Sequence, residues 1–347
     1  MKVLITGGTG FFGMILKSYL HSQKIKYINL DLFVDDKDKK KGIMCQGDLT
    51  RIKDIEKCFK EYGPYDAICH LAAQLAHDVK SEKFLWESNV TGTKNLLKVA
   101  YQHKVKKLIF TSSNCLWGNP VGRPVKENDK PNPIELYGKS KLEAEKIIWK
   151  YHRKLNTIIF RSPTIIAAGR MGLLTMLYEF INENRKVYLV GNGNNRYQLI
   201  YALDYASAIY KTLKSHNHSD IFNIGSDNVK TFNAVYQYVI NNADSKSKIY
   251  NLPKNLTLLT LKLLYKLKLS PLGPYQYKMI AEDFEFDTTK IKKILHWSPT
   301  KTNEQMFLEA YKYFIKNKEK INKNHSSLPA HRRGSKMGVI KLVKFLS

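Results

Sequence analysis

The stretch Lys2-Val-Leu-Ile-Thr-Gly-Gly-Thr-Gly-Phe-Phe-Gly13 decides the fold of this chain. Its apolar residues 3–6 predict a short buried strand, and the apolar spacing that follows Gly13 predicts a helix. Gly7 permits a tight turn, Gly10 lets backbone N–H groups approach a pyrophosphate, and Gly13 lets the helix pack close to the strand. A strand, a glycine turn and a helix in this order are typical of a dinucleotide-binding motif.

A second apolar stretch, residues 26–31, ends in an acid, Asp31. A carboxylate at the end of the second strand hydrogen-bonds the adenosine ribose hydroxyls and repels a 2′-phosphate. The sequence therefore predicts NAD, rather than NADP, as the cofactor.

Strand and helix patterns alternate through the first half of the chain. Strands are predicted at 2–6, 26–31, 67–71, 107–112 and 157–161, and helices at 12–22, 51–62, 82–102 and 136–153. Short apolar strands separated by helices predict an α/β fold, a Rossmann doubly wound parallel sheet with helices on both faces. Ligands of such folds bind beyond the carboxyl ends of the strands.

The alternation breaks down after about residue 165, which predicts a division of the chain. Residues 1–165 are expected to form the NAD-binding Rossmann domain, to which residues 199–215 return through a helix N-capped by Asp204. Residues 166–198 and 216–315 are expected to form a smaller C-terminal α/β substrate lobe, in which the leucine-rich stretch 256–269 is interpreted as a core helix. Residues 316–347 are interpreted as a basic linker followed by an amphipathic segment.

The charge of the chain is strongly positive, with a formal net charge of +27 over 347 residues. Because the lysines are spread along the chain without a basic and aromatic module, no nucleic-acid partner is predicted. Residues 316–347 hold nine Lys or Arg and one acid, Glu319. This tail is either a solvated or self-docking terminus or a peripheral contact to an anionic membrane.

The spacing of the cysteines and the search for targeting signals indicate in which cellular compartment the protein is expected. The four cysteines show no CxxC spacing, so neither a zinc site nor a disulfide framework is expected. No targeting peptide and no apolar stretch of membrane-spanning length is recognised. We therefore expect a cytoplasmic enzyme, with the tail offering association with the inner membrane surface, and no metal.

Tyr137 and Lys141 form the first part of a predicted catalytic group. They lie four residues apart at the start of a helix, on one face. A phenol of pKa about 10 is a poor base at neutral pH, and a nearby cation favours its phenolate. The pairs Tyr210/Lys214 and Tyr250/Lys254 share this spacing and are interpreted as solvated pairs.

Ser113 ends the fourth predicted strand and is the second part of the predicted catalytic group. Its hydroxyl is expected to hold a substrate alcohol that Tyr137 deprotonates, while Lys141 polarises the phenol and holds the nicotinamide ribose. In the alternative interpretation, Ser112 and Ser113 only terminate the strand.

The chain resembles extended short-chain dehydrogenases/reductases of the NAD-dependent nucleotide-sugar epimerase/dehydratase family over roughly residues 1–315. The motifs that carry the resemblance are Thr6-Gly-Gly-Thr-Gly-Phe-Phe-Gly13, Asp31, Gly47-Asp-Leu49, His70-Leu-Ala-Ala73, Asn89-Val-Thr-Gly-Thr93, Thr111-Ser-Ser-Asn-Cys-Leu-Trp-Gly118, Tyr137-Gly-Lys-Ser-Lys141 and Phe160-Arg-Ser-Pro163. His70 is interpreted as a core histidine, and Asn89 alternatively as a helix-start residue.

The resemblance implies a set of cofactor-binding residues and a homodimer that forms through the helices near 82–102 and 136–153. The implied NAD-binding residues, with Asp48 facing the adenine, are Gly7, Thr9, Gly10, Phe11, Phe12, Gly13, Asp31, Asp48, Leu49, Leu71, Ala72, Ala73, Asn89, Tyr137, Lys141 and Ser162.

The substrate half departs from the family pattern. The Asn that usually follows the Arg-x-x of the fifth strand is Thr164, and the arginine expected seven residues before Asp204 is Tyr197, beside Arg196. A third family arginine falls near Tyr277 and Lys278. The substrate residues inferred from this comparison are Ser113, Asn114, Thr164, Arg170, Arg196 and Lys278, the last three neutralising a diphosphate.

These features predict an NAD-dependent epimerase, acting at C4 of a nucleotide-diphosphate sugar through a transient 4-keto intermediate, in surface glycan biosynthesis. One alternative is a dehydrogenase of a hydroxysteroid or lipid-type alcohol. Another is a sugar-nucleotide dehydratase, which Asn114 and Cys115 disfavour because neither is a good general acid.

Overall fold

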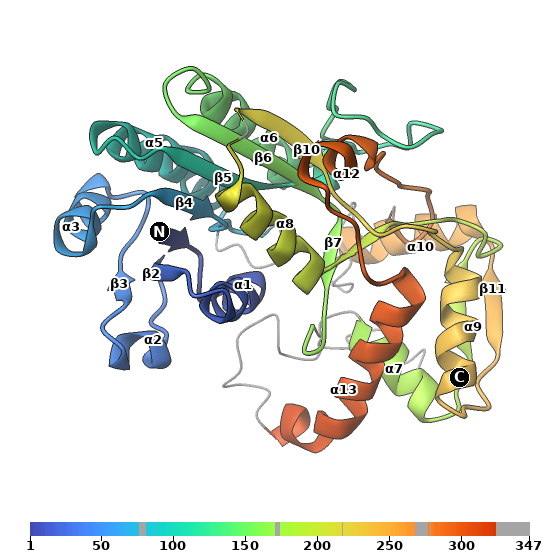
Figure 1. The fold of residues 1–347 in the computed structure, drawn as a ribbon. Coiled ribbons are helices and arrows are strands. Elements are labelled where there is room, and N and C mark those ends of the chain that lie inside the picture. Colours follow the sequence, from blue (N-terminus) through green and yellow to red (C-terminus); the bar gives the residue numbers. More distant parts are fainter. Residues whose placement is uncertain (76–80, 171–173, 217, 268–276, 278, 324–347) are drawn as a thin grey trace.

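A seven-stranded parallel sheet forms the centre of the protein (Figure 1). The computed structural model describes residues 1–75, 81–170, 174–216, 218–267, 277 and 279–323. In the order of the sheet, the strands are β10 (Asp220–Asn223), β6 (Asn156–Ser162), β5 (Lys107–Ser113), β4 (Ala67–His70), β1 (Lys2–Thr6), β2 (Lys26–Asp31) and β3 (Met44–Gln46). The strand order reverses between β1 and β4, which opens a crevice at the carboxyl ends of these strands. The predicted Rossmann fold is confirmed.

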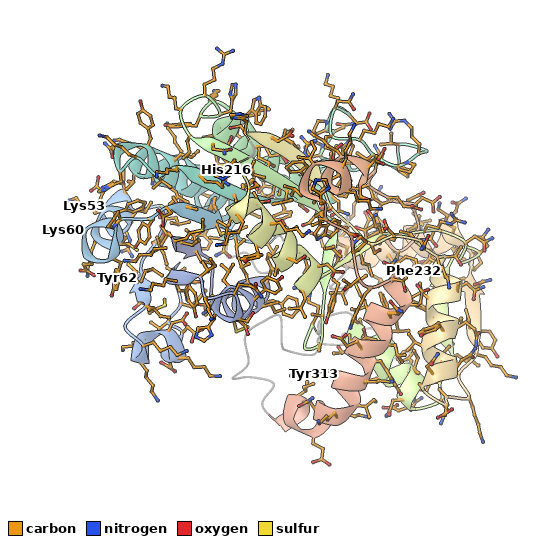
Figure 2. All side chains as sticks on the ribbon, viewed as in Figure 1. Lys53, Lys60, Tyr62, His216, Phe232 and Tyr313 are labelled. Carbon is orange, nitrogen blue, oxygen red and sulfur yellow. The ribbon has the colours of Figure 1, made fainter. Side chains whose placement is uncertain are left out.

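Helices cover both faces of the sheet, as the side-chain alternation along β1 requires. Val3 and Ile5 belong to the apolar cluster under one face, and Leu4 belongs to the cluster under the other. The first face carries α1 (Phe11–Ser22) and α8 (Ala202–Lys214), and the second carries α3 (Ile52–Tyr62), α5 (Gly92–Gln102) and α6 (Leu136–Trp149). Figure 2 shows Lys53 and Lys60 on α3, where both side chains are exposed.

The connection from β9 (Leu199–Tyr201) to α8 corrects one prediction. The helix begins at Ala202 with Tyr201 as its N-cap, so Asp204 lies inside the first turn and is not the cap. The Asp204 carboxylate instead accepts hydrogen bonds from the backbone N–H and hydroxyl of Thr300, at 2.8 and 2.6 Å. Tyr205 of α8 stacks on Phe12 of α1 with ring centres 4.6 Å apart.

Many of the remaining elements lie beside the sheet, on the right in Figure 1, but the short helix α2 (Asp36–Lys40) lies at the lower left, below β2 and β3. Two small parallel sheets pair β7 (Thr164–Ile166) with β9 and β8 (Val187–Val190) with β11 (Ile249–Leu252). The other helices are α2 (Asp36–Lys40), α4 (Glu82–Trp86), α7 (Leu174–Asn182), α9 (Phe232–Asn242), α10 (Lys254–Lys266), α12 (Thr289–Leu295) and α13 (Asn303–Lys323). Strand β10 lies in the range 216–315 expected for the lobe, yet it pairs with β6 in the central sheet, where four residues suffice for an edge strand.

Two further expectations about helices are wrong. The leucine-rich stretch is not a core helix, because no residue of α10 is buried. The chain does not become a linker at 317, because α13 continues to Lys323 and packs Phe314 and Ile321 into the core. The rest of the expected linker and the amphipathic segment lie outside the described residues. Within the described ranges, no helix is both long and apolar enough to span a bilayer.

Candidate functional site

The glycine turn between β1 and α1 has the geometry that a dinucleotide requires. Gly7 has φ of 75° and donates its backbone N–H to Leu30 O at 3.1 Å. A Cβ atom on Gly13 would lie 2.3 Å from Gly7 O, so no larger residue fits this contact between helix and turn. The N-terminus of α1, which begins at Phe11, therefore lies against the turn and presents N–H groups suited to a pyrophosphate.

Asp31 lies beside this turn at the carboxyl end of β2. Its carboxylate accepts the backbone N–H of Thr9 at 2.9 Å and that of Phe33 at 3.0 Å. Burial raises the pKa of Asp31, although these two backbone bonds act in the opposite direction. A carboxylate held next to the turn fits the ribose of NAD, as the sequence predicts.

The loops after β3 and β4 complete the rim of the crevice. Asp48 Oδ1 accepts both the backbone N–H and the hydroxyl of Thr50 at 2.8 Å, and Leu49 is buried. Leu71 donates its N–H to Thr6 O at 3.1 Å, which holds the segment that continues through Ala72 and Ala73 at the edge of β1.

His70 is a core histidine, as expected. Its side chain is fully buried and bridges the hydroxyls of Thr6 and Thr93, at 2.7 and 2.9 Å. Burial, together with the nearby charge of Lys141, lowers the pKa of His70 to about 3. The imidazole is therefore neutral at physiological pH and has a structural role.

Asn89 lies in a π-helical turn, Glu87–Thr91, that joins α4 to α5. The alternative interpretation as a helix-start residue is therefore wrong. The buried amide accepts the backbone N–H of Gln74 at 2.7 Å and donates to Gln74 O at 3.1 Å and to Ser140 Oγ at 3.0 Å. These contacts tie the loop after β4 to α6, and π-turns of this kind occur frequently at functional sites.

The predicted catalytic residues Tyr137 and Ser113 lie together. Tyr137 is on the first turn of α6, and its buried phenol lies close enough to the Ser113 hydroxyl at the end of β5 for that hydroxyl to act on the pKa of the phenol. The start of α6 can pack this closely against the segment after β5 because residue 138 is a glycine. A Cβ atom on Gly138 would lie 2.2 Å from Cys115 O. Ser113 Oγ also accepts the backbone N–H of Cys115 at 3.1 Å.

Burial dominates the pKa values of Tyr137 and Lys141. Burial raises the pKa of the Tyr137 phenol and Cys115 raises it further, while the Ser113 hydroxyl and the charge of Arg170 act to lower it. Lys141 is buried with its ammonium 4.0 Å from the centre of the Phe110 ring. Burial lowers the pKa of Lys141 to about 7, against the effect of Glu145. In the protein without NAD, desolvation outweighs the nearby charges, so the lowered phenol pKa remains a prediction for the enzyme with the charged nicotinamide bound.

Tyr197 reaches the site, and the sequence interpretation did not assign it a role. The buried amide of Asn114 donates from Nδ2 to the Tyr197 hydroxyl at 2.5 Å. The Tyr197 ring stacks on Phe232 with ring centres 6.4 Å apart (Figure 2 labels Phe232). The sequence did contain a hint of this role, because Tyr197 occupies the position, seven residues before Asp204, at which the resemblance places a substrate-binding arginine.

The other predicted substrate residues differ in whether the structure brings them to Tyr137. Arg170 lies over the Phe11 ring, 5.1 Å from its centre, and its charge acts on Tyr137. Arg196 is exposed and its charge acts on Glu285, so the structure does not bring it to the phenol. Thr164 Oγ1 contacts Met279 Sδ at 3.9 Å, and Lys278 lies outside the described residues.

Ser162, one of the implied cofactor residues, is buried at the end of β6. Its hydroxyl donates to Ser112 O at 3.3 Å. Ser162 thus joins β6 to β5 at the edge that carries Ser113.

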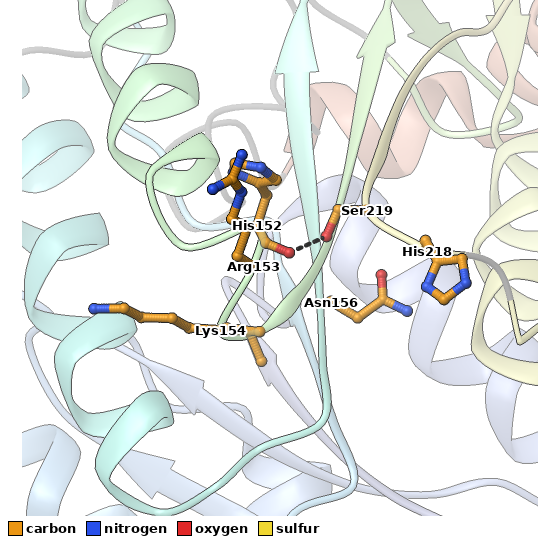
Figure 3. A pocket seen from close by; sticks show the side chains of 7 residues that line it. His152, Arg153, Lys154, Asn156, His218 and Ser219 are labelled. Carbon is orange, nitrogen blue, oxygen red and sulfur yellow. Dashed lines mark hydrogen bonds between the residues drawn. The ribbon is translucent and has the colours of Figure 1, made fainter.

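A hollow at the opposite edge of the sheet does not belong to this site. It is lined by His152, Arg153, Lys154, Leu155, Asn156, His218 and Ser219 (Figure 3). Asn156 begins β6, so the hollow lies at the amino ends of the strands. In the part of the chain that the structure describes, no cluster of His, Cys, Asp and Glu is arranged to hold a metal ion.

Comparisons with known proteins place the chain in a family. A family model described as the NAD dependent epimerase/dehydratase family matches residues 3–225. An uncharacterized protein of Sinorhizobium fredii is 29% identical over 344 residues, which cover 99% of this chain and 85% of that protein. A putative UDP-glucose 4-epimerase of Methanocaldococcus jannaschii is 27% identical over 266 residues, which cover 73% of this chain and 86% of that protein.

A solved structure shows the same fold. The UDP-glucose 4-epimerase of Thermotoga maritima, crystallised with UDP-glucose, matches with a TM-score of 0.75 at 21% identity, covering 91% of this chain and 99% of that one. The matched family model spans the glycine turn, Asp31 and the Ser113–Tyr137 pair. The chain therefore belongs to the NAD-dependent epimerase/dehydratase family and is an NAD-dependent enzyme.

Proposed function

We propose that this protein is a 4-epimerase of a nucleotide-diphosphate sugar that acts in surface glycan biosynthesis. The observation that carries the proposal is the placement of the buried Tyr137 phenol beside the Ser113 hydroxyl at the carboxyl edge of the sheet. This pair lies at the edge where the glycine turn and Asp31 fit NAD. The proposal includes the division of labour expected from the sequence, with the Rossmann domain holding NAD and the smaller lobe holding the sugar nucleotide.

The residues of the site have separate tasks in this reaction. Bound NAD supplies a hydride acceptor and donor. Ser113 holds the C4 oxygen, and Tyr137 removes the proton of the C4 hydroxyl and later returns it. Because the pKa of the phenol is raised in the protein alone, the phenolate requires added positive charge. The charge of Arg170 acts on the phenol in this direction, and bound NAD and Lys141, four residues along α6, are proposed to add to it.

Asn114 and Tyr197 are proposed to line the sugar side of the site. Asn114 follows Ser113 directly, and its hydrogen bond to Tyr197 connects the end of β5 to the smaller lobe. Arg170 is the described cation best placed for a substrate phosphate, because it lies over Phe11 at the start of α1.

The alternative reactions receive less support. A dehydratase needs a general acid after the catalytic serine, and here Asn114 is buried in a bond to Tyr197 while Cys115 is a thiol. A dehydrogenase of a lipid-type alcohol needs an enclosed apolar pocket. Four leucines of α10, namely Leu256, Leu259, Leu263 and Leu267, are exposed, so they line no enclosed pocket.

The test is turnover without added cofactor. Purified protein is incubated with UDP-glucose or UDP-N-acetylglucosamine, and the products are separated by chromatography. Formation of the C4 epimer without added NAD supports the proposal. Accumulation of NADH indicates a dehydrogenase, and a product lighter by one water indicates a dehydratase; either result contradicts the proposal.

A homodimer is a second part of the proposal. Tyr101 of α5 and Trp149 of α6 expose large aromatic surfaces, at 49% and 37%, on the two helices implied as the contact. We expect light scattering to give twice the mass of the chain, and Tyr101→Glu together with Trp149→Glu to give the mass of one chain.

A further inference from the structure

Helix α10 exposes an apolar face that the fold does not use. Leu256, Leu259, Leu263 and Leu267, the last at the C-cap, are between 57% and 65% exposed. Their spacing of three and four residues places them along one side of the helix. A leucine stripe of this kind is uncommon on the surface of a soluble protein and marks an interaction site.

Lysines flank the same face. Lys262 and Lys266 are exposed beside the leucines, and residues 254–268 contain four lysines and no acid. The inward side of the helix carries the half-buried residues Thr257, Leu258, Leu261 and Leu264. An outward face with leucines between lysines suits a surface where the alkyl stems reach apolar groups and the ammonium groups reach anions.

We propose that α10 is a membrane-docking helix whose outward leucines enter the headgroup region of an anionic bilayer while Lys262 and Lys266 contact the lipid phosphates. At 13 residues the helix lies in the plane of the interface and does not span the bilayer.

Charge complementarity favours an anionic bilayer over two other partners for the leucine face of α10, namely a second copy of this chain and the chain's own segment 324–347. A second copy of this chain docked through α10 in a two-fold dimer would bring the lysines of two helices together. The chain's own segment 324–347 is also basic, so it repels the same face. An anionic bilayer attracts each lysine near its surface and accepts the leucines at the same time.

The experiment is sedimentation of the full-length protein with vesicles of phosphatidylcholine and phosphatidylglycerol. We expect the protein to sediment with these vesicles at low salt and to be released at high salt. Replacing Leu256, Leu259 and Leu263 by Ser should lower the bound fraction, with an apparent affinity reduced about tenfold or more. The matched control replaces three exposed aliphatic residues elsewhere, namely Leu203, Ile294 and Ile315, by Ser.

Charge reversal tests the second part of the surface. Lys262→Glu with Lys266→Glu should weaken binding about tenfold at low salt. The control Lys53→Glu with Lys60→Glu changes the net charge equally on the exposed side of α3, outside the proposed dimer contact, and should bind nearly as the wild type. Thermal midpoints and bound NAD of all variants should match those of the wild type, because the replaced side chains are exposed.

Four results would overturn the proposal. The first is full-length protein that remains in solution with anionic vesicles at low salt. The second is a leucine variant that sediments as well as the control variant. The third is a leucine variant whose mass falls to one chain without a change in vesicle binding, which assigns α10 to self-association. The fourth is binding by a chain truncated after Lys323 but not by the full chain, which shows that residues 324–347 cover the helix.

Discussion

The cofactor half and the substrate half of this protein build their sites from different parts. The cofactor half uses backbone geometry, namely the turn at Gly7 and the contact of Gly13 with Gly7 O. The substrate half uses side chains brought from distant segments, such as Tyr197 against Asn114. A backbone site leaves a fixed spacing of glycines in the sequence, whereas a side-chain site leaves no local pattern.

The strongest test of this comparison is Tyr137→Phe, which removes the proposed base from the residue pair where the two halves meet. We expect kcat to fall about a thousandfold, with NAD still bound. Tyr210→Phe is the matched control, because Tyr210 also precedes a lysine by four residues but lies on α8, near Tyr19. A Tyr137→Phe enzyme with more than about a tenth of the wild-type rate would contradict the assignment.

Gly13→Ala tests the backbone half alone. The added methyl group would lie 2.3 Å from Gly7 O, so helix and turn must separate. We expect loss of NAD that copurifies with the protein and a loss of stability of about 2 kcal/mol. Absorbance of the released nucleotide and the urea midpoint measure the two effects. Full NAD content in the variant would show that the close contact is dispensable.

Tyr197→Phe tests the side-chain half. It leaves the buried amide of Asn114 without its hydroxyl partner, and we expect kcat/KM to fall about tenfold. Arg196→Ala, at the neighbouring exposed position, should change kcat/KM by less than about threefold, since that charge acts on Glu285. A larger loss of kcat/KM in Arg196→Ala than in Tyr197→Phe would support the sequence prediction that Arg196 binds the substrate diphosphate.

The smallest effect at neutral pH concerns His70, under the cofactor half. Its pKa is lowered from 6.5 to about 3, so the unfolded chain binds a proton between these values that the folded chain excludes. The stability is therefore complete above pH 6.5 and falls toward pH 3, with a slope from His70 of up to about 1.4 kcal/mol per pH unit. The slope should be smaller in His70→Asn, measured by urea unfolding at several pH values. Parallel pH dependence in both proteins would contradict the assignment.

Several parts of the site could be predicted from the sequence, for a physical reason. The strand before Gly7, the acid that ends β2 and the pair on α6 each lie within one element or at its end, so local spacing reveals them. Ser113 and Tyr137 could be paired because Ser113 ends β5 and Tyr137 lies in the first turn of the α-helix that follows this strand, so both lie at the carboxyl edge of the sheet. Tyr197 could not be assigned, because its contact with Asn114 spans 83 positions of sequence.

The sequence by itself determined the Rossmann fold and the choice of NAD, because glycine spacing, strand alternation and the acid at the end of β2 are local properties of the chain. Only the tertiary structure decided the raised pKa of Tyr137, the π-turn at Asn89 and the outward face of α10. Burial and desolvation depend on every segment that packs around a residue. A leucine-rich helix is identical in sequence whether a core covers it or solvent does.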